Sequence, residues 1–207
     1  GETMLDRVAV LRQLGRYDEA IAVCEEVKAR WPDDQQNRAL VPVWLAAVYG
    51  DRGDLREQLR YGREALSAQE ALAGPDHPWT VWFAHNLAQA IYSSGDMVAA
   101  EAMAREILVR QTRIYGARHT GVASARQLLG GIHLSRGDFE RAKSEALAVL
   151  EIKRQVYPGE HLAIAATLSW LATVSMRQGD LAQALEYAEE ALGMAERVAG
   201  DSPETMA

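Results

Sequence analysis

The chain of 207 residues is 48% hydrophobic and 25% charged, which is the composition of a folded globular protein rather than of a disordered one. Its formal net charge is −7, and its acidic and basic residues are interspersed without forming a basic stripe, which argues against nucleic-acid binding by this region. No segment approaches the roughly 18 consecutive apolar residues of a membrane-spanning helix, and the first residues lack the pattern of a signal peptide.

The single cysteine, Cys24, lies in an apolar helical stretch and cannot form a disulfide within the chain. We predict a buried structural thiol rather than a reactive one. This composition fits a reducing compartment, so we expect a cytoplasmic protein with no membrane partner.

A short turn motif, glycine followed by aspartate or arginine, recurs along the chain. Its glycines are Gly15, Gly53, Gly95, Gly137 and Gly179, and they are separated by 38, 42, 42 and 42 residues. Two other series, of histidines at 77, 119 and 161 and of leucines at 108, 150 and 192, repeat at the same interval of 42. The regular interval predicts an array of structural repeats.

Each repeat is predicted to form two antiparallel helices. In the third repeat, a helix over 79–94 ends at Gly95, which can adopt the positive φ of a C-cap, and Asp96 can cap a second helix that runs to about Tyr115. Pro42 is expected to kink the first helix of the second repeat or to delay its start. In chain order the predicted repeats are 1–34, 37–76, 77–118, 119–160 and 161–200, and 201–207 is expected to begin a further, truncated repeat.

Apolar residues at helical spacing indicate how the repeats pack. Phe83, Leu87 and Ile91 should pack on the second helix of their own repeat, which offers Ala100 and Ile107. One hairpin cannot bury both of its faces, so neighbouring hairpins should cover each other. The predicted fold is an all-α, right-handed α-solenoid of about five antiparallel helix-turn-helix repeats, forming one array over 1–207.

The turns, the small residue that follows them and Trp31-Pro32 at the end of the first repeat resemble those of tetratricopeptide repeats. The interval of 42 and the linker Gly74-Pro75-Asp76-His77-Pro78 resemble the kinesin-light-chain subtype, as does the segment His85-Asn86-Leu87-Ala88. The resemblance covers the whole chain and implies a bacterial multidomain signalling or regulatory protein, of which this chain is a fragment.

The first helices of such repeats line a concave groove, and we predict a peptide or partner site there. The predicted site mixes aromatic, amide and hydroxyl side chains with few charges. Its residues are Trp82, His85, Asn86, Gln89, Tyr92, Gln127, Leu134, Ser169, Thr173, Met176 and Arg177. The alternative is that Trp82 and Tyr92 only pack between adjacent hairpins.

Two peptide-holding arrangements of related folds are not matched by the sequence. Related repeats that bind the C-terminal carboxylate of a peptide have Lys and Asn four residues apart on the groove face of the first helix. In none of the five repeats of this chain are the corresponding two residues Lys and Asn. The second Asn of the kinesin-light-chain helix is kept only at Asn86, whereas Leu128 and Trp170 replace it in the next two repeats.

No catalytic, metal or cofactor site is predicted. His77, His119 and His161 should lie about a helix diameter apart, roughly 10 Å, which is too far to share one metal ion. We expect them to cap or brace hairpins, and we expect His133 to be a partly buried core histidine. No phosphate-binding loop, nucleophile elbow or zinc helix occurs.

The leading hypothesis is therefore a protein–protein or protein–peptide interaction scaffold within a larger regulatory protein. The alternative is a sensor that binds a small ligand or signalling peptide and changes the shape of its superhelix. Self-association through an uncapped C-terminal repeat is a further possibility.

Overall fold

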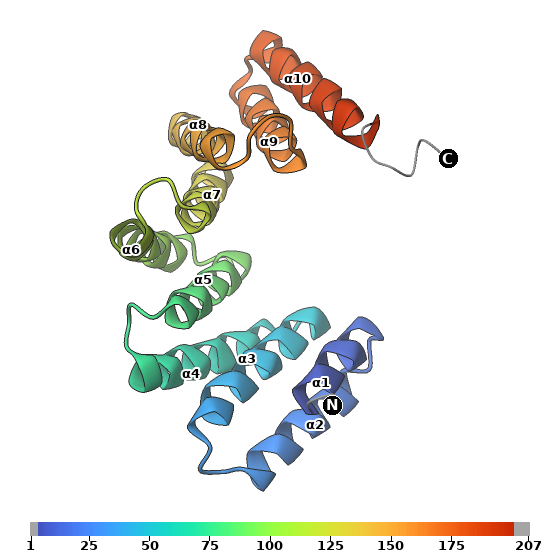
Figure 1. The fold of residues 1–207 in the computed structure, drawn as a ribbon, viewed down its shortest axis with the longest axis vertical. Coiled ribbons are helices and arrows are strands. Elements are labelled where there is room, and N and C mark those ends of the chain that lie inside the picture. Colours follow the sequence, from blue (N-terminus) through green and yellow to red (C-terminus); the bar gives the residue numbers. More distant parts are fainter. Residues whose placement is uncertain (1–3, 201–207) are drawn as a thin grey trace. The chain divides into compact units, whose positions relative to one another are not determined.

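The computed structural model describes residues 4–200, which contain ten α-helices and no strand (Figure 1). The chain divides into two compact units, residues 1–103 and residues 104–207. The boundary falls inside α6 (Met97–Tyr115). The predicted start of a further repeat at 201–207 lies outside the described residues.

The first unit contains five whole helices. They are α1 (Met4–Gln13), α2 (Tyr17–Arg30), α3 (Gln35–Arg52), α4 (Leu55–Ala73) and α5 (Pro78–Ser93). The second unit contains four helices after α6. They are α7 (Thr120–Ser135), α8 (Phe139–Val156), α9 (Leu162–Gln178) and α10 (Leu181–Gly200). The helices α1–α2, α3–α4, α7–α8 and α9–α10 pack as antiparallel pairs (Figure 1), so the fold is the predicted helical repeat solenoid.

The predicted turns are confirmed in detail. All five turn glycines have a positive φ, for example 91° at Gly95, a conformation in which a side chain would be strained. Asp96 then accepts a hydrogen bond from the backbone N–H of Ala99 at 3.0 Å. Asp54, Asp138 and Asp180 cap their helices in the same way, which satisfies amides that have no partner within the helix.

The periodic histidines are also caps, as predicted. The Nδ1 atom of His77 accepts a hydrogen bond from the backbone N–H of Trp79 at 3.2 Å. His119 and His161 accept from the amides two residues further on, each at 3.0 Å. In the second unit these imidazoles also stack on the tyrosines that precede them, Tyr115 and Tyr157.

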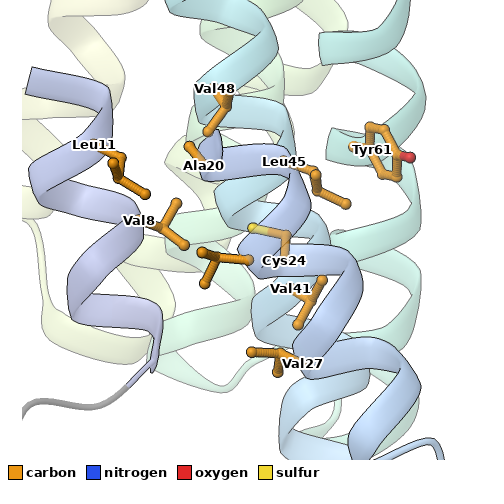
Figure 2. Packing of buried hydrophobic residues seen from close by; sticks show 10 residues of the cluster. Val8, Leu11, Ala20, Cys24, Val27, Val41, Leu45, Val48 and Tyr61 are labelled. Atoms are coloured by element: carbon orange, nitrogen blue, oxygen red, sulfur yellow. The ribbon is translucent and has the colours of Figure 1, made fainter. Parts of the chain in front are cut away.

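The core of the first two hairpins is small and aliphatic. Val8, Leu45 and Val48 are fully buried and lie against Cys24 and Tyr61, as Figure 2 shows. The prediction that Cys24 is buried is confirmed, and burial raises the pKa of its thiol to about 12. The thiol therefore stays protonated in the folded protein at neutral pH.

Of the two effects expected of Pro42, the delayed start is wrong, because α3 begins at Gln35 and continues through the proline to Arg52. Phe83 packs against Ala39 and Ala65 of the preceding hairpin, a contact that was not predicted. The Pro42 side chain is buried within α3.

The core of the second unit is centred on α9. Ile164, Leu168 and Leu171 are buried between α8 and α10, where they contact Leu150 and Met194. His133 is buried as well, more completely than we expected. The hairpins α1–α2, α3–α4 and α7–α8 are thus each covered by the first helix of the next hairpin.

Candidate functional site

The first unit contains an open groove of about 610 Å³. One wall is α3, the other is α5, and α4 contributes Gln58, Gly62 and Ala65 between them. A volume of this order is typical of ligand-binding clefts, which measure about 300–1,000 Å³. The groove is therefore large enough for one or two peptide side chains.

Aromatic rings stand on both walls of the groove. Trp82 on α5 is 48% exposed and lines the groove. Its ring packs against the buried Phe83, with the two ring centroids 5.4 Å apart. Trp44 on α3 lies under the guanidinium group of Arg12, 5.9 Å from the ring centroid. Because these rings are already packed against neighbouring side chains, they can contact an apolar ligand with little further loss of side-chain entropy.

The groove carries little unbalanced charge. Nε of Arg12 donates to Oδ2 of Asp51 at 2.8 Å, so the two lining charges neutralise each other. The other polar lining groups include the amide side chains of Gln58, Asn86 and Gln89, which can donate and accept hydrogen bonds together. This arrangement suits a peptide backbone and a neutral side chain better than an isolated charged group.

Three of the five residues predicted for the third repeat line this groove, and two do not. Trp82, Asn86 and Gln89 line it, followed by Ser93, at spacings of four, three and four residues. His85 and Tyr92 are half-buried and are not among the lining residues. The open groove therefore lies about one residue to one side of the predicted stripe on α5. Burial lowers the pKa of His85, and its Nδ1 atom has no hydrogen-bond partner among the described residues.

In the second unit a tryptophan occupies the equivalent place. Trp170 is equivalent to Asn86, because each lies nine residues before the turn glycine of its repeat. Trp44 and Leu128 occupy the same position in the second and fourth repeats. The Trp170 ring lies so close to Gly130 of α7 that a Cβ atom added there would meet it at 2.4 Å. The indole also packs against the buried Val149 and its neighbours. The ring thus fills the space between α7 and α9 that corresponds to the open groove.

The residues predicted for the fourth and fifth repeats are not gathered in that place. Gln127 is exposed and Leu134 is half-buried on α7. Ser169, Thr173, Met176 and Arg177 are exposed on α9. The hydroxyl groups of Ser169 and Thr173 donate to backbone carbonyls four residues earlier, so they are already engaged. Ser169 lines a shallow hollow that α9 forms with α10 rather than with α7.

Sequence reasoning missed the part of the groove that comes from the second repeat. Val43 and Ala47 of α3 line the groove but were not among the predicted residues. The same holds for Trp44 of α3 and Arg12 of α1. The signal for Trp44 was available, because it shares its position in the repeat with Asn86.

Two features of the described residues bear on other functions. Among residues 4–200 no group of three or more His, Cys, Asp or Glu side chains is placed to hold a metal ion. None of the described helices combines the length and the apolar character needed to cross a membrane.

Comparison with known proteins identifies the repeats. Family models described as tetratricopeptide repeat match residues 9–36, 35–108, 82–155 and 164–204. No curated protein sequence matches the chain.

Several solved structures share the fold. BtubC (BKLC) from P. vanneervenii has a TM-score of 0.86 at 20% identity, over 97% of this chain and 81% of that one. A putative kinesin light chain from Podospora anserina has a TM-score of 0.80 at 19% identity, over 94% of each chain. A Rap protein complexed with competence and sporulation factor has a TM-score of 0.73 at 15% identity, over 93% of this chain and 53% of that one. The chain belongs to the tetratricopeptide repeat family, and its fold is of the kinesin-light-chain-like type.

Proposed function

We propose that this chain is a protein-interaction scaffold that holds a peptide segment of a partner protein in the groove between α3 and α5. One observation carries the proposal. In the second, fourth and fifth repeats, the position nine residues before the turn glycine is occupied by a side chain that packs in the core, namely Trp44, Leu128 and Trp170. In the third repeat the same position is the exposed Asn86. An amide at this position leaves the groove open.

The groove chemistry favours an extended peptide with a neutral apolar anchor. Trp44 and Trp82 can contact such a side chain, while Asn86 and Gln89 can pair with backbone groups on either side of it. A charged anchor would lose its hydration without a counter-charge, because Arg12 is already paired with Asp51.

The proposal is tested by selecting a random linear-peptide library on the chain and measuring the dissociation constants of the selected peptides by fluorescence anisotropy. Asn86→Leu places in the groove a residue that the fourth repeat buries at the same position, and Trp82→Ala removes one wall. Each change should weaken binding by about tenfold or more, which corresponds to about 1.4 kcal/mol.

Trp31→Ala is the matched control. Trp31 is also an exposed tryptophan, directly after α2, and it is not among the residues that line the groove. Its removal should leave affinity within about twofold of the unchanged chain. Selected peptides that bind the Asn86→Leu variant as tightly as the unchanged chain would refute the groove assignment.

A sensor of a small ligand or signalling peptide remains the second candidate. It is favoured by the fold shared with a Rap protein whose structure was solved with competence and sporulation factor. Thermal stabilisation by a low-molecular-mass fraction of a cell extract, lost in Asn86→Leu, would favour sensing. Peptide binding without that stabilisation would favour the scaffold. We further propose a cytoplasmic location and a place within a larger regulatory protein.

A further inference from the structure

A second, smaller pocket lies between α2, α3 and α4 of the first unit, and we call it the α2–α4 pocket. Its volume is about 400 Å³, and it shares no lining residue with the groove between α3 and α5. Val41, Pro42 and Leu45 of α3 are buried and form its apolar floor. Trp31, which is 41% exposed, and Ala68 of α4 also line it. The pocket is therefore an apolar hollow with one aromatic wall.

The pocket is open because the first repeat lacks a leucine that the following repeats have. Lys28 stands 13 residues after the turn glycine, and the equivalent residues are Leu66, Leu108 and Leu150. Each of these leucines packs into a core cluster that includes the first helix of the next hairpin. Lys28 is exposed, and α2 has only 14 residues, whereas the later second helices have 18–20. The space that a leucine side chain fills elsewhere is therefore accessible beside α2.

The charged groups around the pocket differ in whether they are already paired. Arg38 is engaged, because its Nε atom donates to the carbonyl oxygen of Pro32 at 3.1 Å and its guanidinium group lies 3.5 Å from Asp33. Lys28 of α2 and Glu64 of α4 also line the pocket, and neither has an ion-pair partner among residues 4–200. One unpaired cation and one unpaired anion therefore stand on the two helices that flank α3.

Pro42 adds a hydrogen-bond acceptor to the same wall. A proline has no backbone N–H, so the carbonyl group of Arg38, four residues earlier, lacks its usual donor within the helix. No other described residue donates a hydrogen bond to this carbonyl. Arg38 and Pro42 both line the pocket. A positively charged donor in the pocket could therefore pair with this carbonyl as well as with Glu64.

We propose that the α2–α4 pocket binds a free amino acid with an aliphatic side chain of about the size of leucine. The side chain lies on Val41 and Leu45, where leucines of later repeats fill the equivalent space. The α-carboxylate pairs with Lys28 and the α-ammonium group with Glu64. A residue inside a peptide chain carries neither charge, so it would leave both groups partly desolvated without a partner. This site is independent of the groove and of the function proposed for it.

Isothermal titration calorimetry of the whole chain with three related compounds tests the proposal. L-leucine carries both charges, N-acetyl-L-leucine lacks the ammonium group, and L-leucinamide lacks the carboxylate. L-leucine should bind about tenfold or more tightly than either analogue, because each analogue leaves one charged group of the pocket without a partner. Glu64→Gln should weaken the binding of L-leucine by about tenfold but change that of N-acetyl-L-leucine by less than about twofold.

Lys28→Leu gives the first repeat the residue that the following repeats have at this position. This variant should lose the binding of L-leucine, and its melting temperature should rise because the added leucine fills the apolar space, which also shows that it is folded. Lys143→Leu is the matched control, since Lys143 lies on α8 and does not line the pocket. Its affinity for L-leucine should stay within about twofold of the unchanged chain.

Three results would overturn the proposal. The first is no binding of L-leucine at millimolar concentration. The second is binding of N-acetyl-L-leucine as tight as that of L-leucine, because the site would then recognise a carboxylate alone, as at the C-terminus of a peptide. The third is undiminished binding of L-leucine by Lys28→Leu, because the ligand would then lie elsewhere. None of these results would affect the groove, whose peptides are tested with separate variants.

Discussion

A methyl group added at Gly130 would collide with the indole of Trp170. The added Cβ atom would lie 2.4 Å from Cη2 and 2.5 Å from Cζ2 of that ring. Carbon atoms in favourable contact are about 3.5–4.0 Å apart, so the ring would have to withdraw by about 1 Å. Gly130→Ala therefore tests directly whether Trp170 fills the space between α7 and α9.

Two opposing effects determine how much Gly130→Ala changes the free energy of unfolding. Replacing a glycine inside a helix with alanine stabilises the folded state by about 0.5–1 kcal/mol. Overpacking a core costs about 1–3 kcal/mol. The clash involves a rigid ring, so we expect overpacking to prevail and the free energy of unfolding to fall by about 1 kcal/mol. In a chain of this size the melting temperature should fall by about 2–4 °C.

Urea unfolding followed by circular dichroism measures the change, with Gly50→Ala as the control. Gly50 is also inside a helix, but an added Cβ would meet the Nε2 atom of Gln58 at 2.6 Å, the end of a flexible side chain that can swing aside. Gly50→Ala should therefore stabilise the protein by about 0.5–1 kcal/mol. If Gly130→Ala stabilised it equally, the close contact with Trp170 would be refuted.

The remaining predictions concern three side chains whose surroundings are well defined. His161→Ala should cost about 1 kcal/mol, because the amide of Ala163 loses its cap, whereas His161→Asn keeps an N-cap acceptor and should recover most of that loss in urea unfolding. Burial lowers the pKa of His85 in the folded state, so the unfolded chain binds more protons as the pH falls through about 6.5, and stability should decrease below that pH. His85→Gln should flatten this part of the profile between pH 7 and 5, and an unchanged slope would contradict the assignment. Cys24 should react with a thiol reagent at pH 8 only as fast as the protein opens, because its pKa is raised to about 12, and rapid labelling in native buffer would count against its burial.

The features that sequence reasoning predicted well are those that depend on local chemistry. Gly95 ends a helix because its conformation has a positive φ, and Asp96 and His77 cap helices through atoms two or three residues away. These interactions need no knowledge of neighbouring hairpins. Their regular recurrence was enough to predict the helical hairpins and their order.

The groove could be predicted only in part, because it depends on contacts between hairpins. Periodicity identified the exposed side of α5 but not its exact direction. Of the predicted residues, Trp82, Asn86 and Gln89 line the groove. His85 and Tyr92 do not, and Ser93, which was not predicted, does. The direction is set by how α5 crosses α3 and α4, as the packing of Phe83 on Ala39 and Ala65 shows. A sequence pattern along one helix does not contain that crossing angle.

One position per repeat then decides whether the space between hairpins is filled by a side chain or left open. A fully buried tryptophan side chain removes about 150–250 Å² from water, and a half-buried one about half of that, which is worth about 2–3 kcal/mol. Trp170 contributes packing of this kind, whereas Asn86 leaves its groove open. The third repeat therefore gives up stability that the fifth retains, and such a trade-off is what the proposed binding function requires.

Transplanting the closed arrangement tests this reasoning. Asn86→Trp combined with Ala46→Gly copies the pair formed by Trp170 and Gly130, since Ala46 lines the groove at the position that Gly130 occupies in its repeat. Burial of the ring should add about 2–3 kcal/mol and the helical glycine should cost about 0.5–1 kcal/mol, a net gain of about 1–2 kcal/mol in urea unfolding. The same double variant should lose the selected groove peptides. A variant that is less stable than the unchanged chain, or that is stabilised yet still binds those peptides, would show that Asn86 does not hold the groove open.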